Sequence, residues 1–296
     1  MNVCKVVIPV AGWGTRSLPA SKNIPKEMLP IYNKPVIQYV VEEAIQAGVR
    51  DVVFITNKDK HAIEDHFDYN LQLEAVLERG GKTELLALVR SVAEMVNIIS
   101  IRQKKQLGLG HAVLCARDVV RNDDAFGICV GDDLMFGEHT GLSQLLDVVN
   151  KTGMPCIGVM EVPKDRVNRY GIVAGYTVEP GIWRITEMVE KPAVDKAPSN
   201  LAIVGRYILT PDIFDYLETA EPGHGGEIQL TDAMARLAAD KGMLAVKMRG
   251  SRFDAGDWAE YLTANIYFGL HDPEIRDSLL AGLKVVMEYA LAQQKP

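Results

Sequence analysis

Residues 5–16 of the 296-residue chain read KVVIPVAGWGTR, an apolar run followed directly by two glycines and an arginine. A continuous apolar run of this length is typical of a strand buried on both faces, as in a parallel sheet. Gly12 and Gly14 follow at the point where such a strand would end. Because ligands of open α/β sheets bind beyond the carboxyl ends of the strands, the stretch predicts a binding loop at that edge.

The remainder of the first half alternates between strand-like and helix-like segments. Strands are expected at residues 51–56, 97–102 and 125–133. Helices are expected at residues 35–48, 58–67 and 110–120, with a further helical segment inserted at 73–96. Strands that alternate with helical crossovers predict an α/β fold with a doubly wound, mostly parallel, Rossmann-like sheet. After residue 155 the pattern becomes richer in strands, and two helices are expected at 258–270 and 273–292.

Composition limits the classes of protein to which the chain can belong. Its net charge is −7, opposite in sign to a nucleic-acid-binding surface, so no nucleic-acid partner is expected. The apolar runs are too short to span a bilayer, and residues 1–10 lack the pattern of a secretory signal. We therefore expect a cytoplasmic protein with no membrane partner. The four cysteines are widely spaced and predict neither a disulfide nor a zinc site.

The glycine loop itself is compatible with several interpretations. A Walker loop requires a lysine after its last glycine, which is missing here, and Ser17 stands where the third glycine of a dinucleotide fingerprint belongs. A tight turn without any ligand is the simplest alternative. However, Arg16, Lys22, Lys26 and Lys34 concentrate positive charge in this segment of an acidic protein. That contrast favours a polyphosphate site.

Several longer motifs point to a known family. Residues 7–38 resemble the signature of the sugar-nucleotide pyrophosphorylases. Further motifs are similar to the bacterial members that act on UTP and glucose 1-phosphate: IPKEML, RQKKQLGLGHAVLCA, VEKP, APSNLAIVGRYIL and GEIQLTDA. The resemblance is collinear from residue 3 to about residue 270. Several long motifs in order are more specific than a single glycine pattern.

The resemblance implies a nucleotidyl transfer. The phosphate of glucose 1-phosphate would attack the α-phosphorus of UTP, giving UDP-glucose and pyrophosphate. The nucleophile is already an anion, so the protein has to align two anions and neutralise their charge rather than supply a general base. The implied cofactor is Mg²⁺. Two alternatives stay open: a catalytically weak regulatory paralogue, and a related enzyme that uses dTTP or another sugar.

Two aspartates match the family's metal ligands. Asp132, in CVGDDLMF, would hold Mg²⁺ and contact the substrate, and Asp254, in RFDAGDW, would be the second ligand. Carboxylate oxygens suit Mg²⁺, which usually takes its other ligands from water and phosphate. The neighbouring Asp133 and Asp257 are the alternatives at the two positions.

The resemblance also assigns the nucleotide site. Arg16 and Lys26 would meet the β- and γ-phosphates and stabilise the leaving pyrophosphate. Gln103 matches a position that reads uracil, since its amide both donates and accepts hydrogen bonds. The remaining nucleotide-binding positions are Ala11, Gly12, Gly14, Glu27 and Gly108. Trp13 stands where the family usually has a smaller aliphatic residue.

The sugar site is expected in the second half of the chain. Gly171 matches the glycine beside the sugar, Glu190 would bond glucose hydroxyls, and Lys191 would bind the sugar phosphate. Asn200 and Val204 are expected to line the same pocket.

These implications predict a domain organisation. Residues 1–270 would form the nucleotidyltransferase domain, with 1–150 mainly binding the nucleotide and 151–257 mainly binding the sugar. Residues 258–296 would form a C-terminal helical segment. Apolar residues recur in it at helical spacing: Ile275, Leu279, Leu283, Val286 and Ala290. This stripe could pack on its own subunit or on a second copy, and we expect a homo-oligomer, either a dimer or a tetramer.

Overall fold

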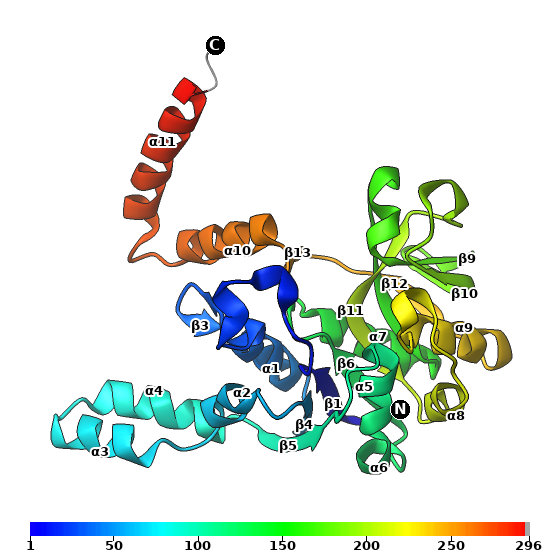
Figure 1. The fold of residues 1–296 in the computed structure, drawn as a ribbon, viewed down its shortest axis with the longest axis horizontal. Helices are drawn as coiled ribbons and strands as arrows, with labels where there is room; N and C mark the ends of the chain where they lie inside the picture. The colour runs from blue at the N-terminus through cyan, green and yellow to red at the C-terminus, as the bar shows by residue number, and fades with distance from the viewer. Residues whose placement is uncertain (294–296) are drawn as a thin grey trace.

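A nine-stranded sheet forms the centre of the computed structural model, which describes residues 1–293 (Figure 1). The strands lie in the order β5 (Asn97–Arg102), β4 (Asp51–Thr56), β1 (Val3–Pro9), β6 (Ala125–Cys129), β11 (Leu201–Leu209), β8 (Cys156–Glu161), β12 (Leu244–Lys247), β10 (Ile182–Glu190) and β9 (Gly171–Glu179). The expected α/β class is confirmed. One sheet contains strands from both halves of the chain, and the predicted division of labour between 1–150 and 151–257 stays a prediction.

The direction of the strands changes at β11. Strands β5, β4, β1 and β6 pair in parallel, as the alternation of strands and helices predicted. Strand β11 then pairs antiparallel with both β6 and β8, while β8 and β12 are parallel. The outer strands β10 and β9 are antiparallel. The four strands from the first half of the chain are therefore all parallel, whereas the strands from the second half form a mixed part in which only β8 and β12 are parallel.

Helices cover both faces of the sheet, which explains the apolar run in β1. Successive side chains of a strand point to opposite faces. Val6 and Ile8 accordingly join the core under α1 (Val36–Gln46) and α7 (Gly141–Thr152), while Val7 joins the core on the other face. That second face is covered by α5 (Leu109–Cys115), α6 (Arg117–Val120), α8 (Ile213–Glu218) and α9 (Leu230–Asp240).

Two short sheets lie outside the main one. Strand β7 (Asp133–Phe136) pairs antiparallel with β13 (Ser251–Asp254), and β2 (Pro30–Ile31) pairs with β3 (Lys34–Pro35). In the first of these, Asp254 lies opposite Asp133. Strands of four residues are too short to show a clear alternation of apolar and polar residues in the sequence. This pairing nevertheless brings the turn after β6 next to the segment that precedes α10 (Trp258–His271).

The inserted segment 73–96, expected as one helical stretch, is two helices. Helix α3 (Leu71–Arg79) ends at Gly80, and α4 (Thr83–Glu94) begins after Gly81, whose φ of 64° favours glycine. The two helices pack together as a hairpin that projects from the body, next to the short helix α2 (His61–His66) (Figure 1).

Two helices end the described chain, as expected. They are α10 (Trp258–His271) and α11 (Arg276–Gln293), and α11 extends away from the sheet (Figure 1). Residues 294–296 of the expected C-terminal segment lie outside the described residues. Among residues 1–293, no helix has both the length and the apolar character that crossing a bilayer requires.

A fully buried ion pair joins β11 to α1. The Arg206 guanidinium donates to both carboxylate oxygens of Glu43, at 2.8 and 2.7 Å. It also donates to the backbone carbonyl of Asp133 at 2.6 Å, and Glu43 accepts from the backbone N–H of Leu142. Hydrogen bonds to all these groups offset part of the cost of burying two charges. The pair fixes the backbone just after β6.

Substituting one partner of this pair should be more damaging than substituting both. Arg206→Met leaves the Glu43 carboxylate buried and unpaired, so we expect the free energy of unfolding to fall by about 3–5 kcal/mol. The double variant Glu43→Leu/Arg206→Met should recover part of that loss, because no unpaired charge remains. Urea denaturation followed by circular dichroism measures both values. A single variant as stable as the parent protein would contradict this account.

Candidate active site

Two carboxylates from distant parts of the chain meet at the edge of the sheet. Asp132 follows β6, and Asp254 ends β13, where the pairing with β7 holds it beside the same turn. A Cβ atom built on Gly256 would lie 2.9 Å from an oxygen of Asp132 and 2.9 Å from an oxygen of Asp254. Both carboxylates therefore face one small space, which a side chain at position 256 would fill.

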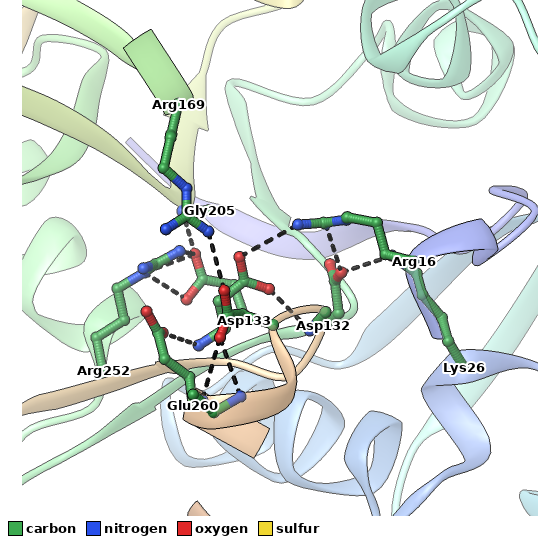
Figure 2. A network of polar contacts seen from close by, with 12 residues as sticks. Arg16, Lys26, Asp132, Asp133, Arg169, Gly205, Arg252 and Glu260 are labelled. Atoms are coloured by element: carbon green, nitrogen blue, oxygen red, sulfur yellow. Dashed lines mark hydrogen bonds and ion pairs between the residues drawn. The ribbon is translucent and has the colours of Figure 1, made fainter. Parts of the chain in front are cut away.

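Two cations reach these carboxylates from the N-terminal loop. The Nζ of Lys26 donates to Asp132 at 2.5 Å. The Arg16 guanidinium lies 3.8 Å from Asp132 and 3.7 Å from Asp254, so it bridges the two (Figure 2). Arg16 is mostly exposed, whereas Lys26 is largely buried. The sequence-predicted residues Arg16, Lys26, Asp132 and Asp254 are thus one cluster.

The surroundings shift the pKa values of the cluster in different directions. Burial raises the pKa of Asp254, and the negative charge of Asp132 raises it further. Burial opposes ionisation of Asp132 as well, but Lys26 and Arg16 outweigh it and hold the pKa of Asp132 below its usual value. Burial lowers the pKa of Lys26, yet Asp132 and Glu27 raise it more, so Lys26 stays charged. Lys26 and Arg16 thus hold the pKa of Asp132 low, whereas burial and the charge of Asp132 keep the pKa of Asp254 raised.

The alternative ligands Asp133 and Asp257 have other partners. Asp133 accepts hydrogen bonds from the Arg252 guanidinium, at 2.9 and 3.0 Å, and from the backbone N–H of Gly205 at 2.9 Å (Figure 2). It thereby ties β7 to β13 and β11. Asp257 caps the N-terminus of α10 and pairs with Arg169 at 3.0 Å. This geometry favours Asp132 and Asp254 as the pair that faces a ligand.

A pocket of about 390 Å³ opens next to the cluster. Its lining includes eight predicted nucleotide-site residues: Ala11, Gly12, Gly14, Lys26, Glu27, Gln103, Gly108 and Asp132. The sequence did not single out two further lining residues, Gln106 and Glu227. Glu227 belongs to the quoted GEIQLTDA motif, which was the available signal. We call this space the nucleotide pocket.

Glu27 is almost fully buried at the wall of this pocket. Its carboxylate accepts a hydrogen bond at 2.8 Å from the Nζ of Lys60, a buried lysine at the far side of the wall. Burial raises the pKa of Glu27 despite the opposing charges of Lys60 and Lys26. Lys60 was not predicted as a site residue, because a lysine before a short polar helix is normally solvated.

Gln103 and Gly108 form a fixed end of the pocket. The Gln103 amide nitrogen contacts the carbonyl of Gly108 at 3.2 Å and Nδ1 of His111 at 2.9 Å. Burial lowers the pKa of His111 and so favours its neutral form, whose tautomer with the proton on Nε2 accepts at Nδ1. Gly108 has a φ of 105°, and a Cβ there would lie 2.7 Å from Cβ of Glu227 and 2.8 Å from the Ile228 carbonyl. The position therefore requires glycine for two reasons.

The predicted sugar-site residues meet where β9 pairs with β10. Gly171 lies opposite Glu190, and a Cβ at Gly171 would lie 3.0 Å from the Glu190 carboxylate. Glu190 also accepts from the Thr231 hydroxyl at 2.7 Å and lies 3.4 Å from Nζ of Lys191. Lys191 has a φ of 44°, which is uncommon for a residue with a side chain.

Tyr170 connects this sugar side to the carboxylates. Its carbonyl accepts the backbone N–H of Lys191 at 3.0 Å, and its ring lies 5.8 Å from the guanidinium of Arg252. The other two predicted residues lie on or beside β11. The Asn200 amide donates to the carbonyl of Val162, and Val204 is buried against Gly158. Their contribution to a sugar pocket stays a prediction.

The number of carboxylates at the site restricts the kind of metal ion that the protein could bind there. Within residues 1–293, no three Asp, Glu, His or Cys side chains form a group able to hold a metal ion. Two carboxylates fit an ion that takes its other ligands from water and phosphate, which is the usual behaviour of Mg²⁺. A bound cation would stabilise the ionised carboxylate of Asp254, whose pKa is raised in its absence.

Comparisons with known proteins identify the family of the chain. Residues 5–268 match the model of the family described as nucleotidyl transferase. The chain is 49% identical over 279 residues, 94% of its length and 95% of the relative's, to UTP–glucose-1-phosphate uridylyltransferase of Bacillus subtilis strain 168. It is similar in structure to UTP-bound UGPase from Acinetobacter baumannii, with a TM-score of 0.87, 41% identity and coverage of 97% and 99% of the two chains. A UDP-glucose pyrophosphorylase complexed with UDP-glucose gives a TM-score of 0.82, 38% identity and coverage of 92% and 100%.

Gly108 provides a test of the pocket's geometry. In Gly108→Ala the new methyl group meets backbone as well as a side chain, so the loop has to move. We expect a large loss of ligand affinity at the nucleotide pocket, together with lower stability. Gly153→Ala is the matched control, since its φ is 67° but a Cβ there meets nothing within 4 Å. The control should lose only about 1–2 kcal/mol of stability. Calorimetric titration with UTP and thermal unfolding separate the two effects, and equal losses in both variants would contradict the steric explanation.

Proposed function

The chain belongs to the nucleotidyl transferase family, and we propose that it transfers the uridylyl group of UTP to α-D-glucose 1-phosphate, giving UDP-glucose and pyrophosphate. The observation that supports this most directly is the cluster of Arg16, Lys26, Asp132 and Asp254 at the mouth of the nucleotide pocket. The similarity over nearly the full length to relatives named for this reaction supports the choice of substrates.

The reaction needs alignment and charge neutralisation rather than a base. A phosphate oxygen of glucose 1-phosphate forms a bond to the α-phosphorus of UTP. The bond from that phosphorus to the bridging oxygen breaks, and pyrophosphate leaves with the electron pair. Arg16 is mostly exposed and lies 3.8 and 3.7 Å from its two carboxylates, so its side chain has room to turn toward the β- and γ-phosphates. Lys26 is held in place by Asp132 and faces the same pocket, so it can neutralise charge without reorganising.

Mg²⁺ is the proposed cofactor, with Asp132 and Asp254 as its protein ligands. The two carboxylates face a common space, and burial and mutual repulsion leave Asp254 short of a cation. When bound, the ion would polarise the α-phosphate and draw the two substrate anions together. Asp133 and Arg252 hold β13 against β7, and so keep Asp254 beside Asp132.

Gln103 is proposed to read the base. Its amide nitrogen is engaged by Gly108 and His111, so the oxygen Oε1 is the atom it presents to a ligand. Uracil carries a hydrogen on N3 that this oxygen can accept, whereas N3 of cytosine has only a lone pair. The backbone around Ala11, Gly12 and Gly14 leaves room for the ribose and phosphates.

The sugar is proposed to bind between β9 and β10. Glu190 is oriented by Thr231 and would accept hydrogen bonds from glucose hydroxyls. Lys191, next to it, would bind the sugar phosphate. Gly171 has no side chain, and a Cβ atom at this position would crowd the Glu190 carboxylate. Asn200 and Val204 complete the proposed site.

The assembly and location are also proposals. Several apolar side chains of α11 are exposed: Leu280, Val285, Val286, Met287, Tyr289 and Leu291. Leu279 of the predicted stripe packs near Gly269 of α10, while Val286 stays exposed. We propose a homo-oligomer, a dimer or a tetramer, that covers this helix. Sedimentation velocity with and without α11 would test it. A cytoplasmic location fits the use of UTP.

The assignment of Asp254 over Asp257 can be tested with two matched variants. Asp254→Ala should reduce UDP-glucose formation by on the order of 10²–10³-fold, because it removes a group that organises transition-state charge. Asp257→Ala should keep most of its turnover and lose about 1 kcal/mol of stability through the missing helix cap. Pyrophosphate release from UTP and glucose 1-phosphate, with Mg²⁺ present, measures the first effect, and thermal unfolding the second. The reverse pattern would assign the ligand to Asp257.

The same assay decides between the proposed function and its alternatives. Absence of turnover with UTP and any hexose 1-phosphate would favour a catalytically weak regulatory paralogue. Faster turnover with dTTP, or with another sugar phosphate, would favour a related transferase.

Selectivity for the base provides a further test. Gln103→Leu removes the acceptor for N3–H, so we expect kcat/KM for UTP to fall about tenfold or more. The value for CTP should change much less, because CTP gains nothing from this acceptor. Parallel assays with the two nucleotides give the ratio. An unchanged ratio of UTP to CTP would show that another group reads the base.

A further inference from the structure

A second cavity lies against the nucleotide pocket, and the reaction described above does not use it. It has a volume of about 480 Å³, large enough for a small-molecule ligand. It shares Gly12 and Trp13 with the nucleotide pocket. Its other lining residues include Lys22, Ile24, Asn57, Lys58, Asp59 and Lys60. We call this space the side cavity.

The rim of the side cavity has an apolar surface. Trp13 is 62% exposed, although indole is among the largest apolar side chains, and Ile24 is also exposed. An exposed aromatic ring at a concave site is a good platform for a flat ring, because every aromatic base has a face that can stack. The sequence had left Trp13 without a role.

The floor of the cavity is polar and ordered. Asn57 is buried, and its amide donates to the carbonyl of Ala11 at 2.7 Å while its oxygen accepts the N–H of Asp59. Lys60 is buried as well, with its Nζ on Glu27 at 2.8 Å. Buried polar groups held by hydrogen bonds make a rigid surface rather than a loose gap between loops.

The charge of the cavity is positive in an acidic protein. Lys22 and Lys58 line it, Lys60 is paired with Glu27, and Asp59 is the single acid among the lining residues of the described chain. Within residues 1–293, neither Lys22 nor Lys58 has an ion-pair partner. Their ammonium groups are thus available to an anion.

We propose that the side cavity binds a nucleoside phosphate as an effector, with its base stacked on Trp13 and its phosphate on Lys22 and Lys58. A flat ring and an anionic group joined by a short linker match the two features that the cavity combines. The side cavity shares Gly12 and Trp13 with the nucleotide pocket, but Gln103, the proposed base-reading group, lines only the nucleotide pocket.

The two spaces are connected through their common wall. Gly12 and Trp13 line both, and the buried Lys60–Glu27 pair has one partner in each. A ligand that shifts Trp13 or Lys60 therefore also shifts Gly12 or Glu27 at the nucleotide pocket. Any resulting change in affinity has to be reciprocal between the two ligands.

The experiment uses the full-length protein with its nucleotide pocket blocked. The protein is saturated with UDP-glucose and Mg²⁺ and titrated by calorimetry with AMP, adenosine or inorganic phosphate. We expect one AMP per chain, and weaker binding of adenosine and of phosphate alone. Lys22→Ala and Lys58→Ala should each weaken AMP binding about tenfold, and Trp13→Ala should do so through lost stacking. Lys82→Ala, an exposed lysine between α3 and α4, is the control and should bind AMP as the parent does.

Enzyme kinetics supply the second readout. Lys58→Ala should turn over UTP and glucose 1-phosphate normally without AMP, while AMP changes the KM for UTP in the parent and not in the variant. The proposal is overturned if AMP does not bind the blocked protein, if it competes with UDP-glucose, or if the lysine variants bind it unchanged. Phosphate binding as tightly as AMP would overturn the role of Trp13. If the parent protein does not turn over UTP and glucose 1-phosphate in the absence of AMP, that result counts against the proposed reaction instead.

Discussion

Repulsion between Asp132 and Asp254 is the constraint around which the site is organised. Both carboxylates face one small, partly buried space, where like charges cost more than they do in water. Lys26 compensates Asp132 directly, and Arg16 lies between the two. The arrangement leaves the cluster short of positive charge on the Asp254 side. Two substrate anions have to come together at this site. A cluster whose negative charge is neutralised only when a cation binds with them favours that encounter.

The fold keeps the two carboxylates together by contacts outside the site. Asp133 links three strands through Arg252 and Gly205, and the buried Arg206–Glu43 pair holds the backbone of the same turn. The glycine loop after β1 needs no such support, because the parallel strands bring their carboxyl ends to one edge by themselves. Local chain geometry therefore places Arg16 and Lys26, while long-range ion pairs place Asp254.

This difference explains how much the sequence could predict. The buried run before Gly12 and the glycine at 108 are local patterns, and the residues near them do line one pocket. The pairing of β7 with β13 depends on four-residue strands far apart in the chain, so only the family resemblance suggested Asp254. Lys60 is buried against Glu27, which is distant from it in the sequence. No pattern around residue 60 therefore predicts its burial. The break at Gly80–Gly81 was visible, yet apolar residues on both sides continued a helical pattern.

Strand β11 has a consequence for how the chain can be divided. It comes from the second half of the sequence, yet it lies antiparallel against β6 and thereby closes the edge of the parallel half. A fragment that stopped near residue 150 would leave the hydrogen-bonding groups of β6 unpaired along a buried, apolar strand. Such an open edge recruits other strands and promotes aggregation. Residues 1–150 therefore do not form an independent folding unit, because their sheet is completed by a strand from the second half of the chain.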